Sequence, residues 1–325
     1  MASTNLLLRQ LIFSVIVLAY NSANAQLKVG FYKETCPQAE AVVKKVVNQV
    51  ISEVPSIGAP LLRIHFHDCF VRGCDGSVLL NSPTQQAEKD SVPNQSIRGF
   101  QTIDRVKSAL EEECPGVVSC ADILAIVARD VVVLNKGPYW EVETGRRDGS
   151  VSKVSEVNLP SPFANISTLV ADFLAVGLSV KDLVVLSGAH TIGTSHCSSF
   201  SNRLYNFTGN GLTDVDVSLD SEYIPQLRSR CSPQDTTTLV EMDPGSRKTF
   251  DTSYYDLVSK RRGLLQSDTA LLDHSETRAY VELHADPEKT SSFFQDFAES
   301  MVRMGRIGVV TGSSGQVRKV CYRVN

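Results

Sequence analysis

The sequence has few long apolar runs, no excess of positive charge and no cysteines at Cys-x-x-Cys spacing. Its longest early apolar run, Leu11 to Tyr20, has about half of the ~20 residues that a membrane-spanning helix needs. The 32 Lys+Arg against 36 Asp+Glu give a formal charge of -4, which argues against nucleic acid as a partner. No Cys-x-x-Cys pair occurs, which disfavours a structural zinc site.

Repeats, low-complexity tracts and long linkers are also missing, so one domain is expected over residues 26–325, although its length permits two lobes. Residues 1–25 are predicted to be a signal peptide, because Arg9 precedes the apolar run and small residues, Ala23-Asn24-Ala25, end the segment. The mature protein is therefore expected to begin at Gln26 and to be soluble, secreted and without a membrane span.

All eight cysteines follow this predicted cleavage site, which indicates four disulfides in an oxidising compartment. Counting alone leaves ~105 pairings open, although Cys69 and Cys74 are close enough to close a tight loop. Three glycosylation sequons begin at Asn94, Asn165 and Asn206, as a secretory route would allow.

Apolar spacing is mostly helical, so the predicted class is mainly α. One apolar stripe, with Pro37 near the helix start, comprises Val42, Val43, Val46, Val47, Val50, Ile51 and Val54, and another comprises Phe293, Phe297, Met301 and Met304. The run from Cys120 to Leu134 is predicted to be a buried helix. Ser179 and Asp182 form a predicted capping box that starts a helix leading to His190.

The segment Arg63-Ile64-His65-Phe66-His67-Asp68-Cys69-Phe70 places chemically active side chains at helical spacing. Arg63 and His67 share a helix face, so a base and a fixed cation point into one pocket. A zinc hydrolase is the alternative, but His65 and His67 are two residues apart and point to different sides of a helix. His190 could be a core histidine or an axial metal ligand.

The segments from Arg63 to Phe70 and from Asp182 to Gly193 resemble the distal and proximal haem helices of plant secretory (class III) haem peroxidases. The resemblance runs from about Gln26 to Cys321 and includes Gly145-Arg146-Arg147-Asp148. It implies a haem peroxidase fold in which two helical lobes sandwich a haem, with four disulfides and little β structure. The implied cofactors are protohaem (haem b), without thioether links since no Cys-x-x-Cys-His occurs, and two Ca²⁺ ions.

The resemblance also implies a role for each haem-site residue. His190 would be the axial iron ligand, and Asp268 would accept the other ring proton and strengthen the imidazole as a ligand. On the distal side His67 would be the base that moves a peroxide proton, and Arg63 would stabilise the developing charge.

Further implied distal residues are Asn94, which would hold the second nitrogen of His67, Glu88 as the carboxylate supporting Asn94, and Phe66 as a wall against bulky substrates. Because Asn94 would then be buried, its sequon should stay unused, which leaves Asn165 and Asn206. Pro160, in Leu159-Pro160-Ser161-Pro162, matches the segment where small phenols dock.

Two calcium sites and the disulfide pairing are implied by the same resemblance. Calcium site 1 would comprise Asp68, Val71, Gly73, Asp75 and Ser77, and site 2 would comprise Thr191, Asp243, Ser246, Thr249 and Asp251. The implied disulfides join Cys36 with Cys114, Cys69 with Cys74, Cys120 with Cys321, and Cys197 with Cys231.

The expected function is reduction of hydrogen peroxide with one-electron oxidation of phenolic donors such as lignin or suberin precursors, in oxidative stress or wall-polymer formation. The extracellular space or cell wall is the expected location, since the chain ends four residues after Cys321, without the extension of vacuolar relatives. A monomer is also expected. Two alternatives remain: a calcium-dependent wall-binding protein that retains the fold without turnover, and an oxygen carrier, which a distal base and arginine disfavour.

Overall fold

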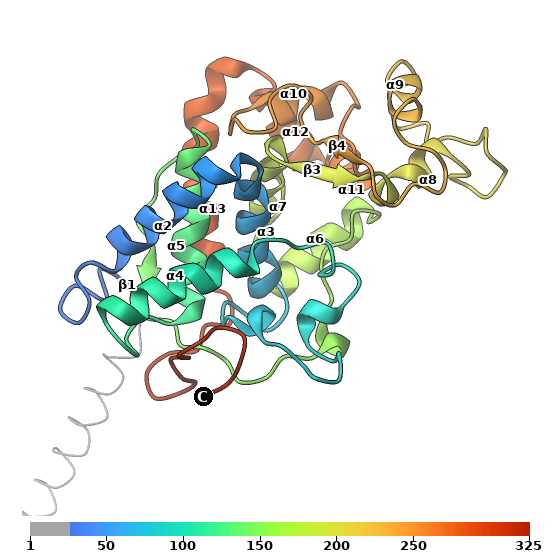
Figure 1. Ribbon diagram of the computed structural model, residues 1–325. Coiled ribbons are helices and arrows are strands. Elements are labelled where there is room, and N and C mark those ends of the chain that lie inside the picture. The colour runs from blue at the N-terminus through green and yellow to red at the C-terminus, as the bar shows by residue number, and fades with distance from the viewer. Residues whose placement is uncertain (1–26) are drawn as a thin grey trace, which may run out of the picture.

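The computed structural model describes residues 27–325, so the predicted signal peptide lies outside the described residues. The described chain is mainly helical, as predicted (Figure 1). Its α-helices are α2 Ala39–Glu53, α3 Gly58–Cys69, α4 Phe100–Glu113, α5 Cys120–Leu134, α6 Ile166–Ala175, α7 Val180–Ser187, α8 Ser201–Leu204, α9 Ile224–Arg228, α10 Ser253–Ser259, α11 Gln266–Ala270, α12 Ser275–His284 and α13 Thr290–Met304. None of the described helices is long and apolar enough to cross a bilayer.

Sheet structure over residues 27–325 is confined to two short antiparallel pairs. Strand β1 (Lys28–Val29) pairs with β2 (Glu143–Thr144), and β3 (Thr194–His196) pairs with β4 (Leu239–Glu241). The first pair attaches the start of the described chain to the segment that follows α5. The second pair directly follows the 3-10 helix η5 (Gly188–Thr191), so it fixes the chain next to His190.

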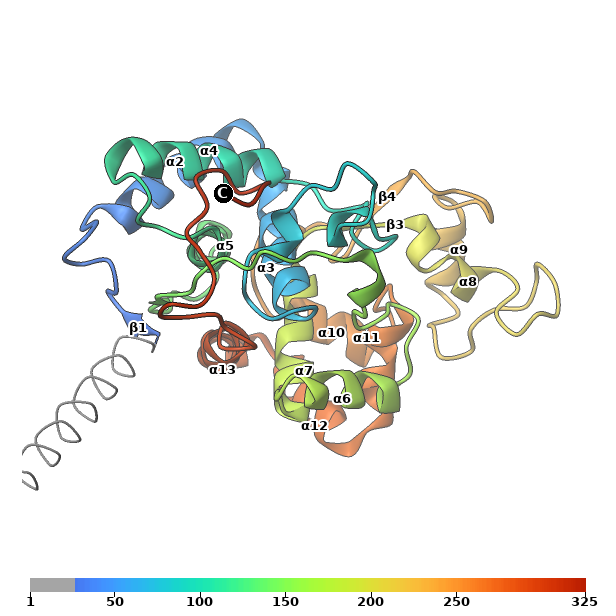
Figure 2. The same ribbon diagram turned by 90° about the horizontal axis from the view of Figure 1, so that it is seen from below.

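The helices form two groups that share one large core. In the first group α5 contacts α2, α3 and α4; in the second, α7 contacts α6, α12 and α13 (Figure 2). Buried side chains from both groups belong to one continuous cluster. A second, smaller core lies around α8, α9 and β4, the region that projects to the right in Figure 1. Helix α3 of the first group and α7 of the second lie next to each other in both views.

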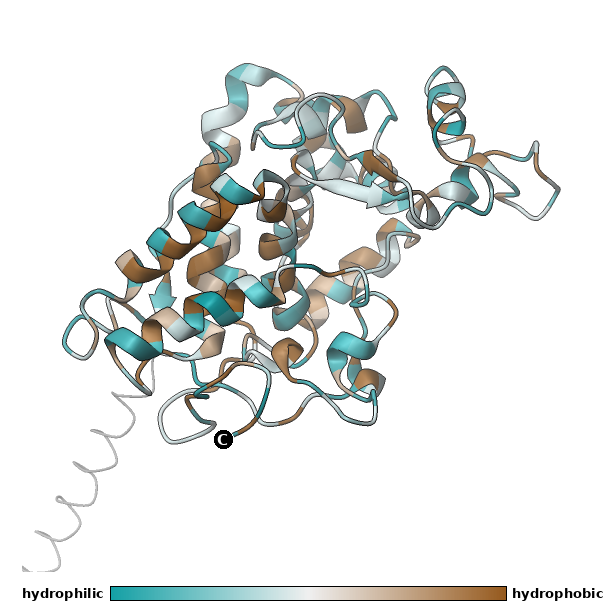
Figure 3. Ribbon diagram, viewed as in Figure 1, coloured by the Kyte–Doolittle hydropathy of each residue, from teal (hydrophilic) through white to brown (hydrophobic). Residues whose placement is uncertain are grey.

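Burial follows the predicted patterns. Helix α5 spans Cys120–Leu134, as expected, and only its last two residues are exposed. Figure 3 shows α2 striped in polar and apolar colours, whereas α5 is apolar for most of its length. The α13 stripe of Phe293, Phe297, Met301 and Met304 is fully buried. These observations confirm the helical periodicity.

Four disulfides tie the helices together, in the pairing that the resemblance implies. They join Cys36–Cys114, Cys69–Cys74, Cys120–Cys321 and Cys197–Cys231. The third closes the longest loop, 201 residues, and holds the C-terminal segment against the start of α5. The second closes the tight loop that follows α3.

Candidate functional site

Helix α3 supplies the distal side chains, and its contact with α5 anchors it in the core. His67 is buried, whereas Arg63 and Phe66 are only partly buried although α3 lies inside the helical assembly. The Phe66 ring lies 5.3 Å from the His67 ring, edge to face. Arg63 and His67, one helical turn apart, therefore present a cation and an imidazole on the same side of α3.

His67 is held by a two-step hydrogen-bond chain. Its Nδ1 lies 2.5 Å from Oδ1 of Asn94, whose Nδ2 donates to the backbone carbonyl of Glu88 at 2.8 Å. Because the amide oxygen can only accept, Nδ1 carries the proton and Nε2 keeps its lone pair. Burial, followed by the charge of Arg63, lowers the pKa of His67 to about 3, so the ring is neutral at physiological pH.

The contact between Asn94 and Glu88 is made by a different group of Glu88 than the carboxylate expected from the sequence. Asn94 is bonded by the backbone oxygen of Glu88, not by its carboxylate, which points elsewhere. Arg63 is held by the same loop, since it donates from Nη2 to the Pro93 carbonyl at 3.1 Å and from Nη1 to Ser96 Oγ at 2.9 Å. Burial lowers the pKa of Arg63 to about 10, which still leaves a cation at neutral pH.

Helix α7 supplies the opposite histidine. The capping box is confirmed: Asp182 N donates to Ser179 Oγ at 3.1 Å, and Ser179 N donates to Asp182 Oδ2 at 2.9 Å. After Asp182, α7 is apolar and buried from Leu183 to Val185 and becomes partly exposed at Leu186, and η5 then carries His190. The cap thus fixes where the helix begins and where His190 lies.

His190 is paired with a buried carboxylate. Its Nδ1 lies 2.8 Å from Oδ1 of Asp268, which also accepts the Tyr254 hydroxyl at 3.0 Å, and Oδ2 of Asp268 accepts the Leu265 amide at 2.9 Å. Asp268 is 1% exposed, which excludes an ordinary surface aspartate. Within residues 27–325 no hydrogen bond to Nε2 of His190 is found, and 38% of this side chain is exposed. A ring fixed at Nδ1 with an open Nε2 has the form of a metal ligand.

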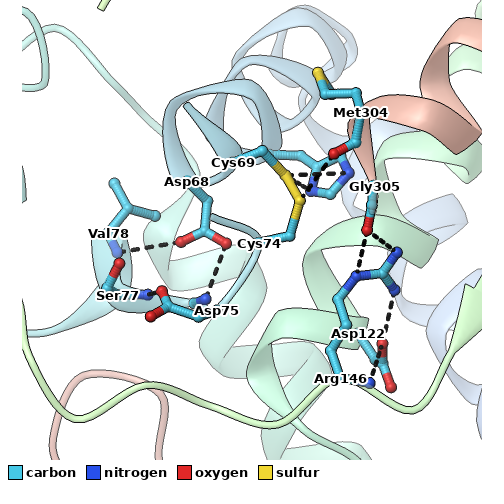
Figure 4. Close-up of a disulfide and its surroundings, with 12 residues drawn as sticks. Asp68, Cys69, Cys74, Asp75, Ser77, Val78, Asp122, Arg146, Met304 and Gly305 are labelled. Atoms are coloured by element: carbon cyan, nitrogen blue, oxygen red, sulfur yellow. Dashed lines mark hydrogen bonds and ion pairs between the residues drawn. A yellow bond between two sulfur atoms is a disulfide. The ribbon is translucent and has the colours of Figure 1, made fainter. Parts of the chain in front are cut away.

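Buried acids gather at the end of α3 and in the loop between α3 and η2 (Ser77–Leu79), and Figure 4 shows two of them, Asp68 and Asp75. Asp68 accepts the backbone amides of Gly76 and Val78, and Asp75 accepts that of Ser77. Both carboxylate oxygens of Glu88 and the hydroxyl of Ser77 are buried without a hydrogen-bond partner. Burial raises the pKa values of Asp68, Asp75 and Glu88, the last to about 8.

These groups fit a bound cation. Three buried carboxylates side by side, of which that of Glu88 accepts no hydrogen bond, are costly without a counter-charge, and hard oxygen donors are what Ca²⁺ prefers. The loop supplies backbone carbonyls at Val71 and Gly73, the other implied ligands. Gly73 has φ +94, and a Cβ there would lie 2.5 Å from the Gly308 carbonyl oxygen, so only glycine fits this approach.

A second oxygen cluster directly follows His190. Thr191 Oγ1 donates to Asp251 Oδ1 at 3.1 Å and lies 3.4 Å from Asp243 Oδ2, while Ser246 Oγ donates to Asp251 Oδ2 at 3.1 Å. Thr249 joins through its amide, which donates to the Ser246 carbonyl. Burial, then the charge of Asp251, raises the pKa of Asp243 to about 7. The side chains of four residues predicted for calcium site 2, Thr191, Asp243, Ser246 and Asp251, are thus brought together, and Thr249 is joined to them through its backbone.

Comparison with known proteins decides the family. The family model described as Peroxidase matches residues 43–287. The chain is 63% identical to Peroxidase 27 of Arabidopsis thaliana over 311 residues, covering 95% of this chain and 96% of that protein. It is 55% identical to Peroxidase 1 of Oryza sativa subsp. japonica over 329 residues, covering 100% of both. The chain belongs to the peroxidase family. As a peroxidase it is an enzyme that uses hydrogen peroxide to oxidise donor molecules.

Two further residues of this peroxidase shape the proximal side, and sequence reasoning missed both. Tyr254 donates to Asp268, and the fully buried Arg203 donates from Nη1 to the carbonyls of Gly263, Leu264 and Leu265, just before Asp268. Each contact joins residues 14 or more positions apart. Helical periodicity relates residues three or four positions apart, so it could not predict these contacts of Tyr254 and Arg203.

The residues predicted for phenol docking and glycosylation, Pro160, Asn165 and Asn206, lie at the surface. Pro160 is partly exposed in the loop before α6, and this loop is tied to α11 because the Ser267 amide donates to the Pro162 carbonyl at 3.0 Å. Asn165 caps α6 and is exposed, and Asn206 is exposed, whereas Asn94 is 1% exposed.

Proposed function

We propose that this peroxidase binds haem b between α3 and the α7–η5 segment, where Nε2 of His190 would hold the iron. The proposal rests mainly on one feature that His190 and His67, from different helices, have in common. Nδ1 of each ring is held by a hydrogen-bond partner, Asp268 for His190 and Asn94 for His67. Nε2 of each ring therefore stays free, to bind the iron or to accept a proton. Partly exposed apolar side chains on both segments, Phe66, Leu186 and Ala189, fit a flat apolar ligand.

When bound, the haem supplies the iron at which peroxide is reduced by two electrons. His67 accepts a proton from hydrogen peroxide at Nε2 and returns it to the outer oxygen, so that water leaves. Arg63 stabilises the negative charge that develops on this oxygen, and its hydrogen bonds to Pro93 and Ser96 hold the cation in place. Asn94 keeps His67 in the tautomer that can accept the proton.

On the proximal side Asp268 accepts the Nδ1 proton of His190 and gives the ring more negative character, which favours oxidised iron. The two acid clusters would each hold one Ca²⁺: site 1 follows the distal base at Asp68, and site 2 follows the proximal ligand at Thr191. Calcium would then neutralise buried carboxylates and fix both sides of the pocket.

Small phenols, such as lignin or suberin precursors, would give up single electrons beside the loop that carries Pro160, while Phe66 keeps bulky molecules from the iron. The protein would be made with a signal peptide over residues 1–25, be glycosylated at Asn165 and Asn206, and act as a monomer in the extracellular space or cell wall. The eight cysteines, all paired, support an oxidising compartment.

The test is stopped-flow absorbance of the haem- and calcium-loaded protein mixed with one equivalent of hydrogen peroxide. The wild-type Soret band should bleach and shift rapidly, and a phenol should reverse the change. His67→Ala should slow the reaction by about 10²–10⁴-fold, the usual contribution of a general base. His274→Ala, at the start of α12, is the matched control and should react like the wild type.

An unchanged wild-type spectrum would favour a binding protein without turnover. Slow peroxide reduction together with stable oxygen binding would favour an oxygen carrier.

A further inference from the structure

A row of tyrosine rings leads from the proximal histidine towards the surface. The ring centroids are 5.8 Å apart for His190 and Tyr254, 5.2 Å for Tyr254 and Tyr255, and 5.6 Å for Tyr255 and Tyr280. Tyr254 and Tyr255 are fully buried on α10, whereas Tyr280 is partly exposed on α12. Since α10 packs against α12, the row joins the proposed iron site to the outside.

Both ends of the row have a carboxylate ready to take a proton. A phenol that loses an electron becomes a strong acid, so its oxidation needs a nearby base. The Tyr254 hydroxyl donates to Asp268 Oδ1 at 3.0 Å, and the Tyr280 hydroxyl donates to Asp296 Oδ2 at 2.9 Å, both within proton-transfer reach. Tyr255 instead donates to the Val184 carbonyl, which cannot accept a proton, so its ring acts as a bridge.

Tyr280 is held firmly at its surface position. Its ring stacks on the buried His284 ring at 3.9 Å with an interplanar angle of 24°. Asp296 is also paired with Lys181, 2.6 Å away on α7. Burial and the Asp296 charge raise the pKa of Tyr280, so the resting phenol keeps its proton. Leu283, 50% exposed and three residues further along α12, provides apolar surface beside it.

The other aromatic branch from Tyr255 contains rings that are hard to oxidise. Tyr255 contacts Phe293, which contacts Phe297, and only beyond Phe297 lies Trp140, which is 7% exposed. Phenylalanine gives up an electron far less readily than tyrosine. Of the two branches, therefore, the one towards α12 consists of phenols throughout.

We propose that Tyr280 is a second, surface oxidation site for phenolic polymers that are too large to approach the haem edge. This inference rests on the proposed function, because hydrogen peroxide reacting at the haem supplies the oxidising equivalents. Tyr280 passes one electron inward through Tyr255 and Tyr254 and its proton to Asp296. The polymer phenol then returns one electron to the Tyr280 radical, which recovers the proton from Asp296. The donor releases its own proton to water and leaves as a phenoxyl radical.

The first experiment locates the radical. The haem- and calcium-loaded protein is mixed with hydrogen peroxide and a spin trap without any donor, and the trapped adduct is mapped by peptide mass spectrometry beside freeze-quench electron paramagnetic resonance. The adduct should lie on Tyr280 in the wild type and be absent from this peptide in Tyr280→Phe. Tyr139→Phe, which alters an exposed tyrosine outside the row, is the matched control and should keep the Tyr280 adduct.

The second experiment compares a monomeric phenol with a water-soluble phenolic polymer. In Tyr280→Phe the ratio of polymer rate to monomer rate should fall at least about tenfold, which corresponds to about 1.4 kcal/mol of barrier. Asp296→Asn keeps the size of the acceptor but not its charge and should lower the same ratio. Tyr139→Phe should leave it unchanged.

The relay alone is overturned if the wild-type protein oxidises the monomer but carries no adduct on Tyr280. It is also overturned if Tyr280→Phe leaves the ratio of polymer rate to monomer rate unchanged. Wild-type protein that oxidises neither donor overturns the proposed function, and the relay with it.

Discussion

The buried Glu88 carboxyl should make the calcium-free protein lose stability as the pH rises. The side chain is 0% exposed and neither of its oxygens accepts a hydrogen bond, while Asp68 and Asp75 belong to the same cluster. Burial is the main reason that the pKa of Glu88 rises from 4.5 to about 8. The folded state therefore prefers the protonated acid.

The change in the free energy of unfolding follows from the difference between the pKa of Glu88 in the folded protein and in the unfolded chain. Because the pKa is higher in the folded protein than in the unfolded chain, the stabilisation is fully present below pH 4.5 and is lost as the pH rises through about 8. Each pKa unit corresponds to 1.36 kcal/mol, so the free energy of unfolding should fall by about 5 kcal/mol in total, of which about 4 kcal/mol is lost between about pH 5 and about pH 8.5. Asp68 and Asp75, whose pKa values are also raised, act in the same direction.

The assay is denaturant unfolding with a calcium chelator at about pH 5 and about pH 8.5, with disulfides intact. Glu88→Gln keeps the shape of the side chain but cannot ionise, so the pH dependence should shrink by about 4 kcal/mol while the part due to Asp68 and Asp75 remains, and the variant should be the more stable protein at high pH. Glu113→Gln, at the exposed end of α4, is the control and should behave like the wild type. Excess calcium should restore wild-type stability at high pH, because the cation compensates the buried charges.

Equal stability of the calcium-free wild type at both pH values would show that the buried acids do not favour protonation in the folded state. A Glu88→Gln variant that loses as much stability as the wild type would show that Glu88 is not the group responsible.

Three further predictions concern the proximal side and the surface. Asp268→Asn should raise the reduction potential of the haem-loaded protein in spectroelectrochemistry, because the proximal imidazole loses negative character; an unchanged potential would contradict the pairing. Arg203→Lys should lower the free energy of unfolding by about 2–4 kcal/mol in chemical denaturation, since lysine cannot reproduce the buried guanidinium fork; an unchanged midpoint would count against it. Peptide mapping should find glycans at the exposed Asn165 and Asn206 and none at Asn94, where a glycan would mean that the His67 partner is not buried.

Local features of the sequence determined much of this protein. The Ser179–Asp182 cap and the bounds of α5 were predictable because capping and helical periodicity involve residues a few positions apart. The same holds for Arg63 and His67, one turn apart on α3. Resemblance to a known family then implied the partners of both histidines and the disulfide pairing, which composition and spacing leave open.

Only the tertiary structure decided how these local pieces meet. Asp268 reaches His190 across 78 residues, and the Glu88 carboxylate turns away from Asn94 into the acid cluster, with its backbone left to hold the amide. The row from Tyr254 to Tyr280 likewise exists only because α10 packs against α12. Such contacts depend on how side chains from distant segments fill a shared core, and neither helical periodicity nor motif spacing contains that information.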